Sequence, residues 1–322
     1  MKGLHVLFDG NNTSYRANCT SELYTKTGER TSALLGVLNI THSTIQNLSE
    51  LYDCPVKEII YAWDLGHSPR RKEVFPEYKA NRNKEKSEED KLWMSEFITQ
   101  ANVLHENLPL FGIKSLRKKN WEGDDLIYGL SENLKERYPD DTVVIISTDE
   151  DFHQLIDENI HIFSPIKQIL YTKDNYQALT GIAPHLFLTY KILKGDSSDG
   201  IPGISGIGEK TGKTLVNTYG DLGNLLSLKS KAELMKSKRT SRIFTQEGLE
   251  ILARNNKLIN LKDYVDLTPV QADILDILDE EPFVDTRKAK EFLMKYQLTS
   301  LLVKFKTWIE EFEFVVENFD EQ

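Results

Sequence analysis

The chain has 322 residues, a hydrophobic content of 39% and an aromatic content of 10%, which suffice to fill a sizeable core and argue against a disordered chain. A net charge of -10 would by itself argue against a nucleic-acid partner, because phosphate contacts normally use Lys and Arg. No run of about 18 apolar residues is present, so we expect no membrane contact. Two cysteines without paired spacing, Cys19 and Cys54, predict a reducing, cytoplasmic location and neither a disulfide framework nor a zinc site.

The basic residues are not spread evenly along the chain. They form three groups, Pro69–Lys86, Lys114–Lys119 and Lys229–Arg242. Any one of these groups alone is more typical of a solvated surface than of a binding site. Their meaning therefore depends on what the fold places beside them.

The first third of the chain alternates between apolar runs and helical patterns. Leu4–Phe8 reads as a buried strand that ends at Asp9, and Ser32–Leu51 carries apolar residues at helical spacing. A second strand, Glu58–Trp63, ends at Asp64. The chain then becomes charged and weakly apolar until about residue 106, which predicts an excursion with helical parts.

A second helix is predicted over Asn120–Leu134, with Glu122, Asp124 and Asp125 at its first turn. Acids at a helix start are favoured by the helix dipole, so capping alone is one interpretation. Three acids in four residues are more than a cap requires.

A third strand, Thr142–Ser147, is followed by Asp149 and Asp151, and Ile160–Phe163 reads as a fourth strand. Strands that alternate with helices predict an α/β fold with a mostly parallel central sheet flanked by helices. Acids that follow such strands should gather at one edge of the sheet, where function collects in this architecture. Beyond about residue 185 the pattern of the chain predicts mostly helices, which divides it into regions 1–185 and 186–322.

The acids of these motifs and of the stretch after Lys194 form one candidate cluster: Asp9, Asp64, Glu122, Asp124, Asp125, Asp149, Asp151, Asp196 and Asp199. Crowded carboxylates repel one another unless cations neutralise them. Mg²⁺ is the natural cation, with Mn²⁺ as a substitute, because both take oxygen ligands, and so many acids suggest two ions or more. Two such ions can promote hydrolysis of a phosphodiester.

The stretch Lys194–Leu215 adds a glycine-rich turn to the two acids. Gly206 and Gly208 have the spacing of a turn between two helices, and Lys210 and Lys213 follow it. The spacing before Gly212 does not match a nucleotide-binding Walker loop, and no strand precedes it. We therefore expect the backbone N–H groups of the turn to contact a phosphate group, and we do not expect ATP binding.

Five motifs in order, DGNNTSYRA, YAWDLG with PEYKANR, WEGDD, STDEDFHQL and GDSSDGIPGISGIGEK, resemble those of the 5′ nuclease family, which includes stand-alone phage enzymes and the nuclease domain of bacterial DNA polymerase I. The resemblance covers most of the chain. It implies a PIN-like sheet domain (1–185), a helical arch at about residues 69–106, and a helical DNA-binding subdomain (186–322) with a helix-three-turn-helix at about 200–218. Two departures are Gly123, where the family often has Ala, and Gly200, where it often has Asn.

The resemblance also implies roles for individual residues. Asp9, Asp64, Glu122 and Asp124 would serve a first metal site, Asp149, Asp151, Asp196 and Asp199 a second, and Asp125 would lie near both. Lys79 and Arg82 would face the scissile phosphate, with Asp124 and Asp125 in the same catalytic centre. DNA contacts would come from Tyr15, Arg16, Gly203, Gly206, Gly208, Lys210 and Lys213. The family often holds K⁺ at the helix-three-turn-helix, so K⁺ is expected there.

The implied activity is a Mg²⁺-dependent, structure-specific 5′ nuclease that cuts 5′ flaps and 5′ ends of DNA or RNA primers in duplexes during replication and repair. Two alternatives remain open at this point: a catalytically silent junction-binding protein, and a single-strand ribonuclease of the PIN type. The expected partners are DNA and RNA–DNA duplexes, with a replicative polymerase or single-strand-binding protein as further candidates. The expected form is a cytoplasmic monomer, in the host cytoplasm if the gene is from a phage. The acidic, aromatic end of the chain is interpreted as a packed final helix in preference to a contact site.

Overall fold

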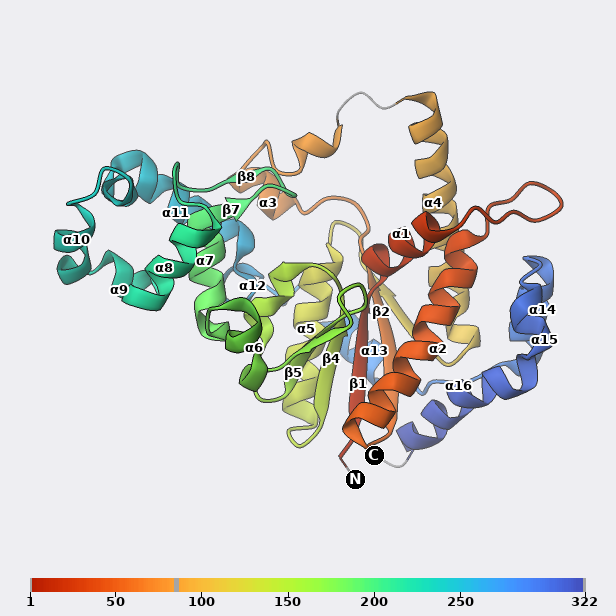
Figure 1. Cartoon of the computed structure of the whole chain (residues 1–322). Helices are drawn as coiled ribbons and strands as arrows, with labels where there is room; N and C mark the ends of the chain where they lie inside the picture. The colour runs from red at the N-terminus through yellow and green to blue at the C-terminus, as the bar shows by residue number, and fades with distance from the viewer. Residues whose placement is uncertain (1, 84–86, 321–322) are drawn as a thin grey trace.

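A six-stranded sheet lies at the centre of the computed structural model, which describes residues 2–83 and 87–320 (Figure 1). Its strands are β1 (Leu4–Asp9), β2 (Val56–Trp63), β3 (Lys114–Arg117), β4 (Thr142–Ile146), β5 (Ile160–Ser164) and β6 (Ile169–Tyr171). Their order is β3-β2-β1-β4-β5-β6, and only the last pairing, β5 with β6, is antiparallel. The predicted mostly parallel sheet is confirmed.

Two edge strands were not anticipated from the sequence. β3 lies inside the basic group Lys114–Lys119, which reads as a solvated surface, yet Lys114 is only 3% exposed. That interpretation was wrong for Lys114, because its ammonium group is buried against Glu58 of the neighbouring strand at 2.9 Å. β6 is only three residues long and has no strong pattern.

Helices cover both faces of the sheet because residues along β1 alternate between two cores. Val6 and Phe8 pack in one core, whereas Leu7 packs in the other. The helices of this half are α1 (Gly10–Thr20), α2 (Ser32–Tyr52), α3 (Pro69–Val74), α4 (Glu88–Asn107) and α5 (Gly123–Arg137). The predicted helices over Ser32–Leu51 and Asn120–Leu134 correspond to α2 and α5.

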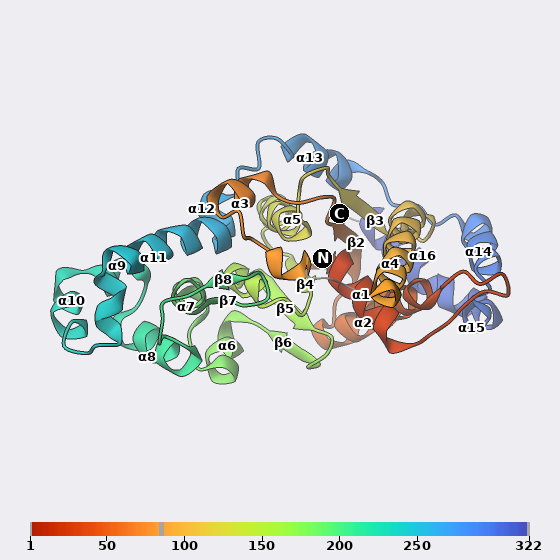
Figure 2. The same ribbon diagram turned by 90° about the horizontal axis from the view of Figure 1, so that it is seen from above.

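The charged excursion after Asp64 contains α3, a 3-10 helix (Ala80–Asn83) and α4. α4 rises beside the carboxyl ends of the strands, while α3 lies on the opposite side of that opening, against α11 (Figure 1, Figure 2). Residues 84–86, the end of the first basic group, lie outside the described residues. α3 and α4 thus flank the edge of the sheet where the strand-end acids emerge.

The rest of the chain is mainly helical. Its elements are α6 (Lys173–Thr180), α7 (Phe187–Lys194), β7 (Gly195–Asp196), β8 (Ile201–Pro202), α8 (Glu209–Tyr219), α9 (Leu222–Leu226), α10 (Leu228–Leu234), α11 (Gln246–Ile259), α12 (Leu261–Tyr264), α13 (Gln271–Asp279), α14 (Thr286–Lys295), α15 (Thr299–Val303) and α16 (Phe305–Asp320). α8 to α11 form a lobe at one side of the sheet, and α14 to α16 lie at the other side (Figure 2). No described helix is both long and apolar enough to cross a membrane.

The final helix, α16, is part of the core. Trp308 and Phe312 are 1% exposed and stack edge-on with each other and near Phe111. The same core contains residues of β1, β2 and α2. Residues 305–320 therefore form a packed helix, as their frequent apolar positions predict, while residues 321 and 322 lie outside the described residues.

Candidate active site

Strand-end carboxylates meet at one edge of the sheet because parallel strands all point the same way. Asp9 is the last residue of β1, and its carboxylate accepts a hydrogen bond from the backbone N–H of Asn12 (3.0 Å), which caps α1. The Ser147 hydroxyl, just after β4, donates to the other oxygen of Asp9 at 2.9 Å. Asp64, just after β2, accepts a 2.6 Å hydrogen bond from the backbone N–H of Gly123. The Asp9 carboxylate thereby connects β1 to the residue after β4, and the Asp64 carboxylate connects the residue after β2 to the start of α5.

The two departures from the family pattern both have a local explanation. A Cβ at Gly123 would lie 3.1 Å from the Asp64 carboxylate, so glycine leaves room for the short hydrogen bond. Gly200 has a φ of 70°, in the left-handed region that glycine adopts freely and asparagine adopts more readily than most residues. Neither departure changes a carboxylate.

These acids line an open cavity of about 880 Å³ between the sheet edge and α4. The cavity brings together many of the predicted site residues, namely Asp9, Tyr15, Arg16, Asp64, Lys79, Arg82, Asp124, Asp149, Asp151 and Asp199. They come from all five motifs along the sequence. The cavity is therefore the candidate active site.

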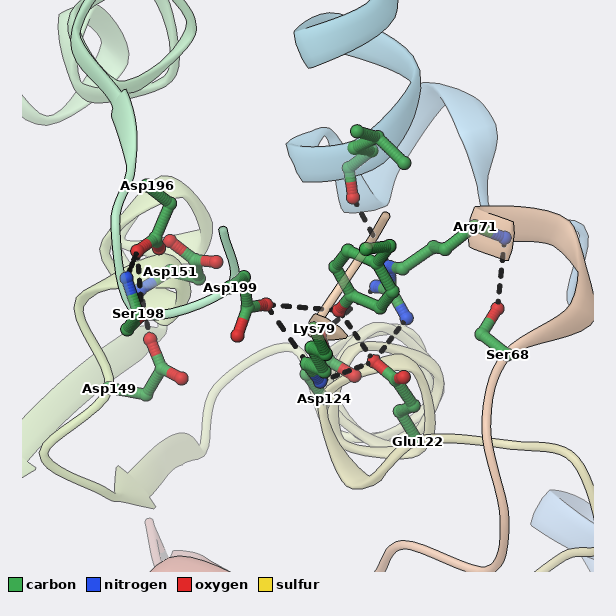
Figure 3. A network of polar contacts seen from close by, with 12 residues as sticks. Ser68, Arg71, Lys79, Glu122, Asp124, Asp149, Asp151, Asp196, Ser198 and Asp199 are labelled. Atoms are coloured by element: carbon green, nitrogen blue, oxygen red, sulfur yellow. Dashed lines mark hydrogen bonds and ion pairs between the residues drawn. The ribbon is translucent and has the colours of Figure 1, made fainter. Parts of the chain in front are cut away.

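A buried arginine on α3 binds the acids at the start of α5. The guanidinium of Arg71, 2% exposed, donates to Glu122 at 2.9 Å (Figure 3). It also donates to Asp124 (3.0 Å) and to both oxygens of Asp125 (2.9 and 2.8 Å). Ser68 caps α3 through the backbone N–H of Arg71 and so helps to fix its position. Asp125 is thus oriented toward an internal cation.

The segment after α3 connects the two groups of acids. Lys79 donates to Glu122 at 2.9 Å, and Arg82 donates to Asp199 at 2.7 Å. The Tyr78 hydroxyl lies within hydrogen-bond distance of both Glu122 (2.9 Å) and Asp199 (3.0 Å) and can donate its one proton to either. In Figure 3, Asp199 lies between the group around Glu122 and the group around Asp196.

Lys79 also has an unusual backbone conformation. Its φ of 57° is in the left-handed region, which costs a non-glycine residue on the order of 1 kcal/mol or more. Its N–H donates to the carbonyl oxygen of Asp199 at 2.9 Å, which holds the conformation in place. Such strain is concentrated at functional sites, because the surrounding structure must maintain it.

A second buried cation lies in the other group of acids. The ammonium of Lys191, on α7, is 2.7 Å from both Asp151 and Asp196. Asp196 also accepts hydrogen bonds from the N–H (2.8 Å) and hydroxyl (2.6 Å) of Ser198. Asp196 is therefore held by the protein from two sides.

The pKa values separate the acids into two kinds. Burial raises the pKa of Asp9 to about 7, and the charges of Asp64 and Asp124 add to this effect. Burial likewise raises the pKa of Asp64, despite the hydrogen bond from Gly123. For Glu122, burial is outweighed by Arg71 and Lys79, which lower the pKa to about 2. Contact with an internal cation does not by itself decide the direction: Lys191 helps to lower the pKa of Asp196 to about 2, whereas burial raises the pKa of Asp125 and of Asp151 despite their contacts with Arg71 and Lys191.

The donor chemistry of the site fits a hard divalent cation. The strand-end ligands are carboxylate oxygens whose charge is poorly compensated, and such oxygens suit Mg²⁺ or Mn²⁺ better than zinc. Within residues 2–83 and 87–320, however, no three acidic, histidine or cysteine side chains form a complete metal-binding group. Mg²⁺ normally keeps several waters and uses only one or two carboxylates, so an open, incomplete set is compatible with it.

Two internal cations, Arg71 and Lys191, were missed by the sequence reasoning. Metal ions therefore need not neutralise the whole acid cluster, because Arg71 and Lys191 neutralise part of it. Arg71 belongs to a basic group that looks like a surface, and Lys191 lies in an otherwise apolar helical run. No local pattern distinguishes either residue from an ordinary exposed cation.

The predicted DNA contacts lie in two places. Tyr15, 45% exposed, meets Trp93 and Phe97 of α4 edge-on, with ring centroids 5.2 and 5.5 Å apart. The two α4 aromatics are four residues apart, a helical spacing that could have indicated a shared face with Tyr15. Arg16 lines the same cavity.

The glycine-rich turn lies farther away, between β8 and α8. A Cβ at Gly203 would come within 2.1 Å of the Lys194 carbonyl oxygen, and Gly206 has a φ of 86°. Both positions therefore require glycine. Gly208 precedes the first residue of α8, and Lys213 forms an exposed ion pair with Glu209 at 2.7 Å, while Lys210 lies on the same helix. The structure brings this turn near α11 but not into the acid-lined cavity.

Comparison with known proteins now identifies the family. Residues 4–181 match the 5′-3′ exonuclease, N-terminal resolvase-like domain, and residues 182–280 match the 5′-3′ exonuclease, C-terminal SAM fold. Among relatives, a 5′-3′ exonuclease of Aquifex aeolicus is 30% identical over 94% of this chain and 94% of that protein. DNA polymerase I of Lactococcus lactis is 27% identical over 86% of this chain, which corresponds to 30% of the polymerase.

Solved structures agree with this fold. A phage T5 5′-exonuclease with bound zinc ions has a TM-score of 0.70 at 24% identity, over 86% of this chain and 98% of that one. A phage T5 flap endonuclease in a pseudo-enzyme-product complex with DNA and metal ions has a TM-score of 0.65 at 21% identity, over 98% of this chain and 99% of that one. At these identities the likeness concerns the fold. With both family models matching consecutive parts of residues 4–280, the chain belongs to the 5′-3′ exonuclease family.

Proposed function

We propose that the chain is a structure-specific 5′ nuclease that hydrolyses phosphodiester bonds at 5′ flaps and at 5′ ends of DNA or RNA primers in duplexes, in replication and repair. The observation that carries the proposal is the 880 Å³ cavity, in which strand-end acids, Lys79 and Arg82 face one another. The phage T5 structure with DNA and metal ions supports this assignment through its shared fold. Family membership supports the 5′-to-3′ polarity.

The proposed metal ligands are the predicted acids, with the strand-end set as the main one. Asp9, Asp64, Asp124 and Asp149 line the cavity. Among residues 2–83 and 87–320, Asp9, Asp64 and Asp149 have no ion-pair partner, whereas Asp124 contacts Arg71 at 3.0 Å. Bound Mg²⁺ or Mn²⁺ would supply an activated water and stabilise the leaving oxygen. Glu122 and Asp125 would act mainly through Arg71, which fixes the first turn of α5.

Lys79 and Arg82 are the proposed groups that face the scissile phosphate. Without substrate their positive charges bind Glu122 and Asp199, at the boundary between the two groups of acids. A phosphate that enters the cavity offers both side chains an alternative anionic partner. Their charges would then stabilise the negative charge that develops on the phosphoryl oxygens during cleavage.

The base at the 5′ end would stack in the aromatic group of Tyr15, Trp93 and Phe97. Tyr15 is 45% exposed and lies in a T-shaped arrangement with each of the other two rings, so part of its ring is accessible to a base. Stacking of this kind contributes about 1–3 kcal/mol per base. Arg16, on the same helix, would contact the adjacent backbone phosphate.

The chain would act as two functional regions. Residues 1–185 would carry the chemistry, with the arch at about 69–106, and residues 186–322 would bind duplex through the turn at about 200–218. A duplex held at that turn would have its junction near the acid-lined cavity. We propose a cytoplasmic monomer, and a replicative polymerase or single-strand-binding protein as further partners.

The test is cleavage of four labelled substrates with and without Mg²⁺: a 5′-flap DNA duplex, a nicked duplex, an RNA-primed duplex and an unstructured RNA. We expect cleavage of the flap and of recessed 5′ ends with Mg²⁺ or Mn²⁺, and none with a chelator. Cleavage of unstructured RNA alone would indicate a PIN-type ribonuclease instead. Tight duplex binding without cleavage in any divalent cation would indicate a junction-binding protein and would contradict the proposal.

A further inference from the structure

α11 connects the lobe that carries the glycine-rich turn with the segment that carries Lys79. The helix runs from the lobe of α8 to α10 toward α3 and α12 (Figure 2), and it packs against both α7 and α3. Just before α11, Arg242 of the 3-10 helix Thr240–Phe244 donates to the carbonyl oxygen (3.1 Å) and the hydroxyl (2.8 Å) of Ser205 in the turn. The first end of α11 is thus attached to the turn.

The second half of α11 contacts the chain where the turn begins. Arg254 donates from Nη2 to the carbonyl oxygen of Pro202 at 2.7 Å, and from Nη2 (2.8 Å) and Nε (3.1 Å) to the side-chain oxygen of Asn255. The amide of Asn255, which is fully buried, also donates to the Pro202 carbonyl oxygen at 3.0 Å. Pro202 ends β8 and directly precedes Gly203 of the turn. The guanidinium is therefore fixed in orientation and holds the end of β8.

The same guanidinium contacts the segment that follows α3. Its central carbon lies 4.7 Å from the centroid of the Phe75 ring, which is a cation–π contact. Phe75 caps the end of α3, and its carbonyl oxygen accepts a hydrogen bond from the N–H of Tyr78 at 2.9 Å. Tyr78 is followed by Lys79. One side chain thus touches both the start of the turn and the segment of the catalytic cations.

The partners of Arg254 show that its shape matters as well as its charge. They are a carbonyl oxygen, an amide oxygen and an aromatic ring, all of them neutral. A planar guanidinium can donate within its plane and stack with its face at the same time, whereas an ammonium group cannot. Arg254 therefore acts as a connector between two segments.

Further contacts join the same elements around Arg254. Tyr78, Ile201 of β8, and Leu258 and Ile259 of α11 form a small apolar core, against which Phe75 packs. The N–H of Lys79 donates to the carbonyl oxygen of Asp199 in the loop between β7 and β8. A displacement of β8 would therefore be passed on to Lys79.

We infer that Arg254 is a positioning residue, which makes the placement of Lys79 and Arg82 depend on a duplex held at the glycine-rich turn. The inference rests on the proposed function, because it requires both a bound duplex and a phosphate in the acid-lined cavity. A seated duplex fixes the turn and the end of β8, and Arg254 passes this position on through Phe75. Arg254 does not line the acid-lined cavity, so it acts through other residues and does not touch the reacting atoms.

The test uses duplexes that carry a single-stranded 5′ flap and a duplex arm of decreasing length. Wild-type affinity, measured by fluorescence anisotropy with a chelator, should fall once the arm is too short to reach the turn, and this length separates long-arm from short-arm substrates. Single-turnover cleavage with Mg²⁺ at saturating enzyme then gives a rate on each substrate that does not depend on affinity. The variants are Arg254→Ala, Arg254→Lys and Phe75→Leu. The control is Arg287→Ala, which removes an exposed arginine of α14.

For the wild type we expect faster cleavage of the long-arm substrate than of the short-arm substrate. Arg254→Ala should lose this advantage: its long-arm rate should fall about 10–100-fold, as for a reacting group displaced by on the order of 1 Å. Its short-arm rate and its affinity for the duplex should stay close to the wild-type values. Arg254→Lys should lose most of the advantage because it cannot donate and stack at once, and Arg287→Ala should match the wild type.

Phe75→Leu tests the contact between the guanidinium and the ring. Leucine keeps an apolar side chain beside Tyr78 but offers no aromatic face. Phe75→Leu should therefore lose part of the long-arm advantage. The double variant Phe75→Leu/Arg254→Ala should be no slower than Arg254→Ala alone, because both changes break the same connection.

Three results would each overturn the inference. The first is a wild-type rate that does not depend on arm length, and the second is an Arg254→Ala variant that keeps the long-arm advantage. The third is an equal loss of rate on both substrates, which would show a merely structural role. Should Arg254→Ala fail to fold, Arg254→Lys and Phe75→Leu decide by the same comparison. Each of these results concerns Arg254 alone, whereas a wild-type protein that cleaves neither substrate would contradict the proposed function itself.

Discussion

The two edges of the central sheet both carry buried charged side chains, but they balance their charges differently. At the amino edge, where the parallel strands begin, His5 lies between Glu58 (2.6 Å) and Asp141 (3.0 Å). Lys57 pairs with Asp141 and Lys114 with Glu58, both at 2.9 Å. Each carboxylate at this edge therefore has two cationic or potentially cationic partners.

The pKa values follow this difference in pairing. At the amino edge, burial is outweighed by the partners of Glu58 and Asp141, so the pKa values of both acids are lowered. At the carboxyl edge, burial and neighbouring acids raise the pKa values of Asp9 and Asp64. Buried charge is thus compensated where it serves only the fold and left uncompensated where a cation is expected to bind.

The largest expected effect comes from removing a carboxylate at the carboxyl edge. Asp149→Asn should reduce flap cleavage by more than the roughly 10–100-fold that loss of an outer partner of a metal ligand costs. Duplex binding in a chelator should remain close to wild type, because the proposed duplex contacts lie elsewhere. The measurements are single-turnover cleavage and anisotropy. Equal loss of cleavage and binding would argue against a metal-ligand role.

The second-largest effect is expected from removing the ammonium group of Lys79, which faces the carboxyl edge. Lys79→Ala should lower the rate of the chemical step on the order of 10²–10³-fold, as for loss of one group that stabilises transition-state charge. Substrate affinity should change much less. Arg287→Ala, which removes an exposed cation of α14 that pairs with Glu291, is the control for the loss of a positive charge. If Lys79→Ala weakened affinity but left the rate at saturating substrate normal, Lys79 would bind the phosphate backbone of the substrate and would not stabilise the transition state.

The third prediction is that neutralising an acid has opposite effects on stability at the two edges. Without divalent cations, Asp141→Asn should lower the free energy of unfolding by about 3–5 kcal/mol, because it leaves buried Lys57 and His5 without their partner. Asp9→Asn should raise it by roughly 1–3 kcal/mol at pH 8, because a carboxylate with a raised pKa destabilises the folded state when ionised. Urea unfolding measures both.

The signs follow from proton linkage. The pKa of Asp9 is about 7 in the folded protein, above its ordinary value of 3.8, so the unfolded chain releases its proton first as the pH rises. The contribution of Asp9 to the free energy of unfolding therefore decreases as the pH rises from 3.8 to about 7. A destabilising Asp9→Asn, or a neutral Asp141→Asn, would remove the distinction between the edges.

The smallest expected effect concerns the pH dependence at the amino edge. Burial alone would lower the pKa of His5, but hydrogen bonds to Asp141 and Glu58 outweigh it and raise the pKa above 6.5. The stabilisation by protonated His5 is therefore complete below pH 6.5, and it is lost as the pH rises through the pKa of His5 in the folded protein. His5→Gln should remove this part of the decline between pH 6.5 and 9 in urea midpoints. An unchanged pH profile would show that His5 is neutral in the folded state.

The sequence predicted the carboxyl edge well because strand ends are visible as local patterns. Asp9, Asp64 and Asp149 each follow an apolar run, and parallel strands must bring such positions together. The edge strand β3 was not predicted, because only one residue of Lys114–Lys119 is apolar and the first residue of the strand, Lys114, is buried through its ion pair with the distant Glu58. Short edge strands carry little pattern of their own.

The pairings within the site could not be predicted in the same way. Arg71 is separated by 51 residues from Glu122 and by 54 from Asp125, and only the path of α3 over α5 brings them together. Arg242 is 37 residues from Ser205. Contacts of this kind depend on tertiary packing, which a single sequence does not encode in any local period.

The most direct test of the difference between the edges is the effect of Mg²⁺ on the free energy of unfolding. A cation that binds only the folded protein stabilises it in proportion to the logarithm of its concentration once the site is saturated. The wild-type protein should therefore become more stable as Mg²⁺ rises at constant ionic strength, and Asp9→Asn should lose most of this response. A wild-type protein that is indifferent to Mg²⁺, or an Asp9→Asn variant that responds equally, would contradict a divalent-cation site at the carboxyl edge.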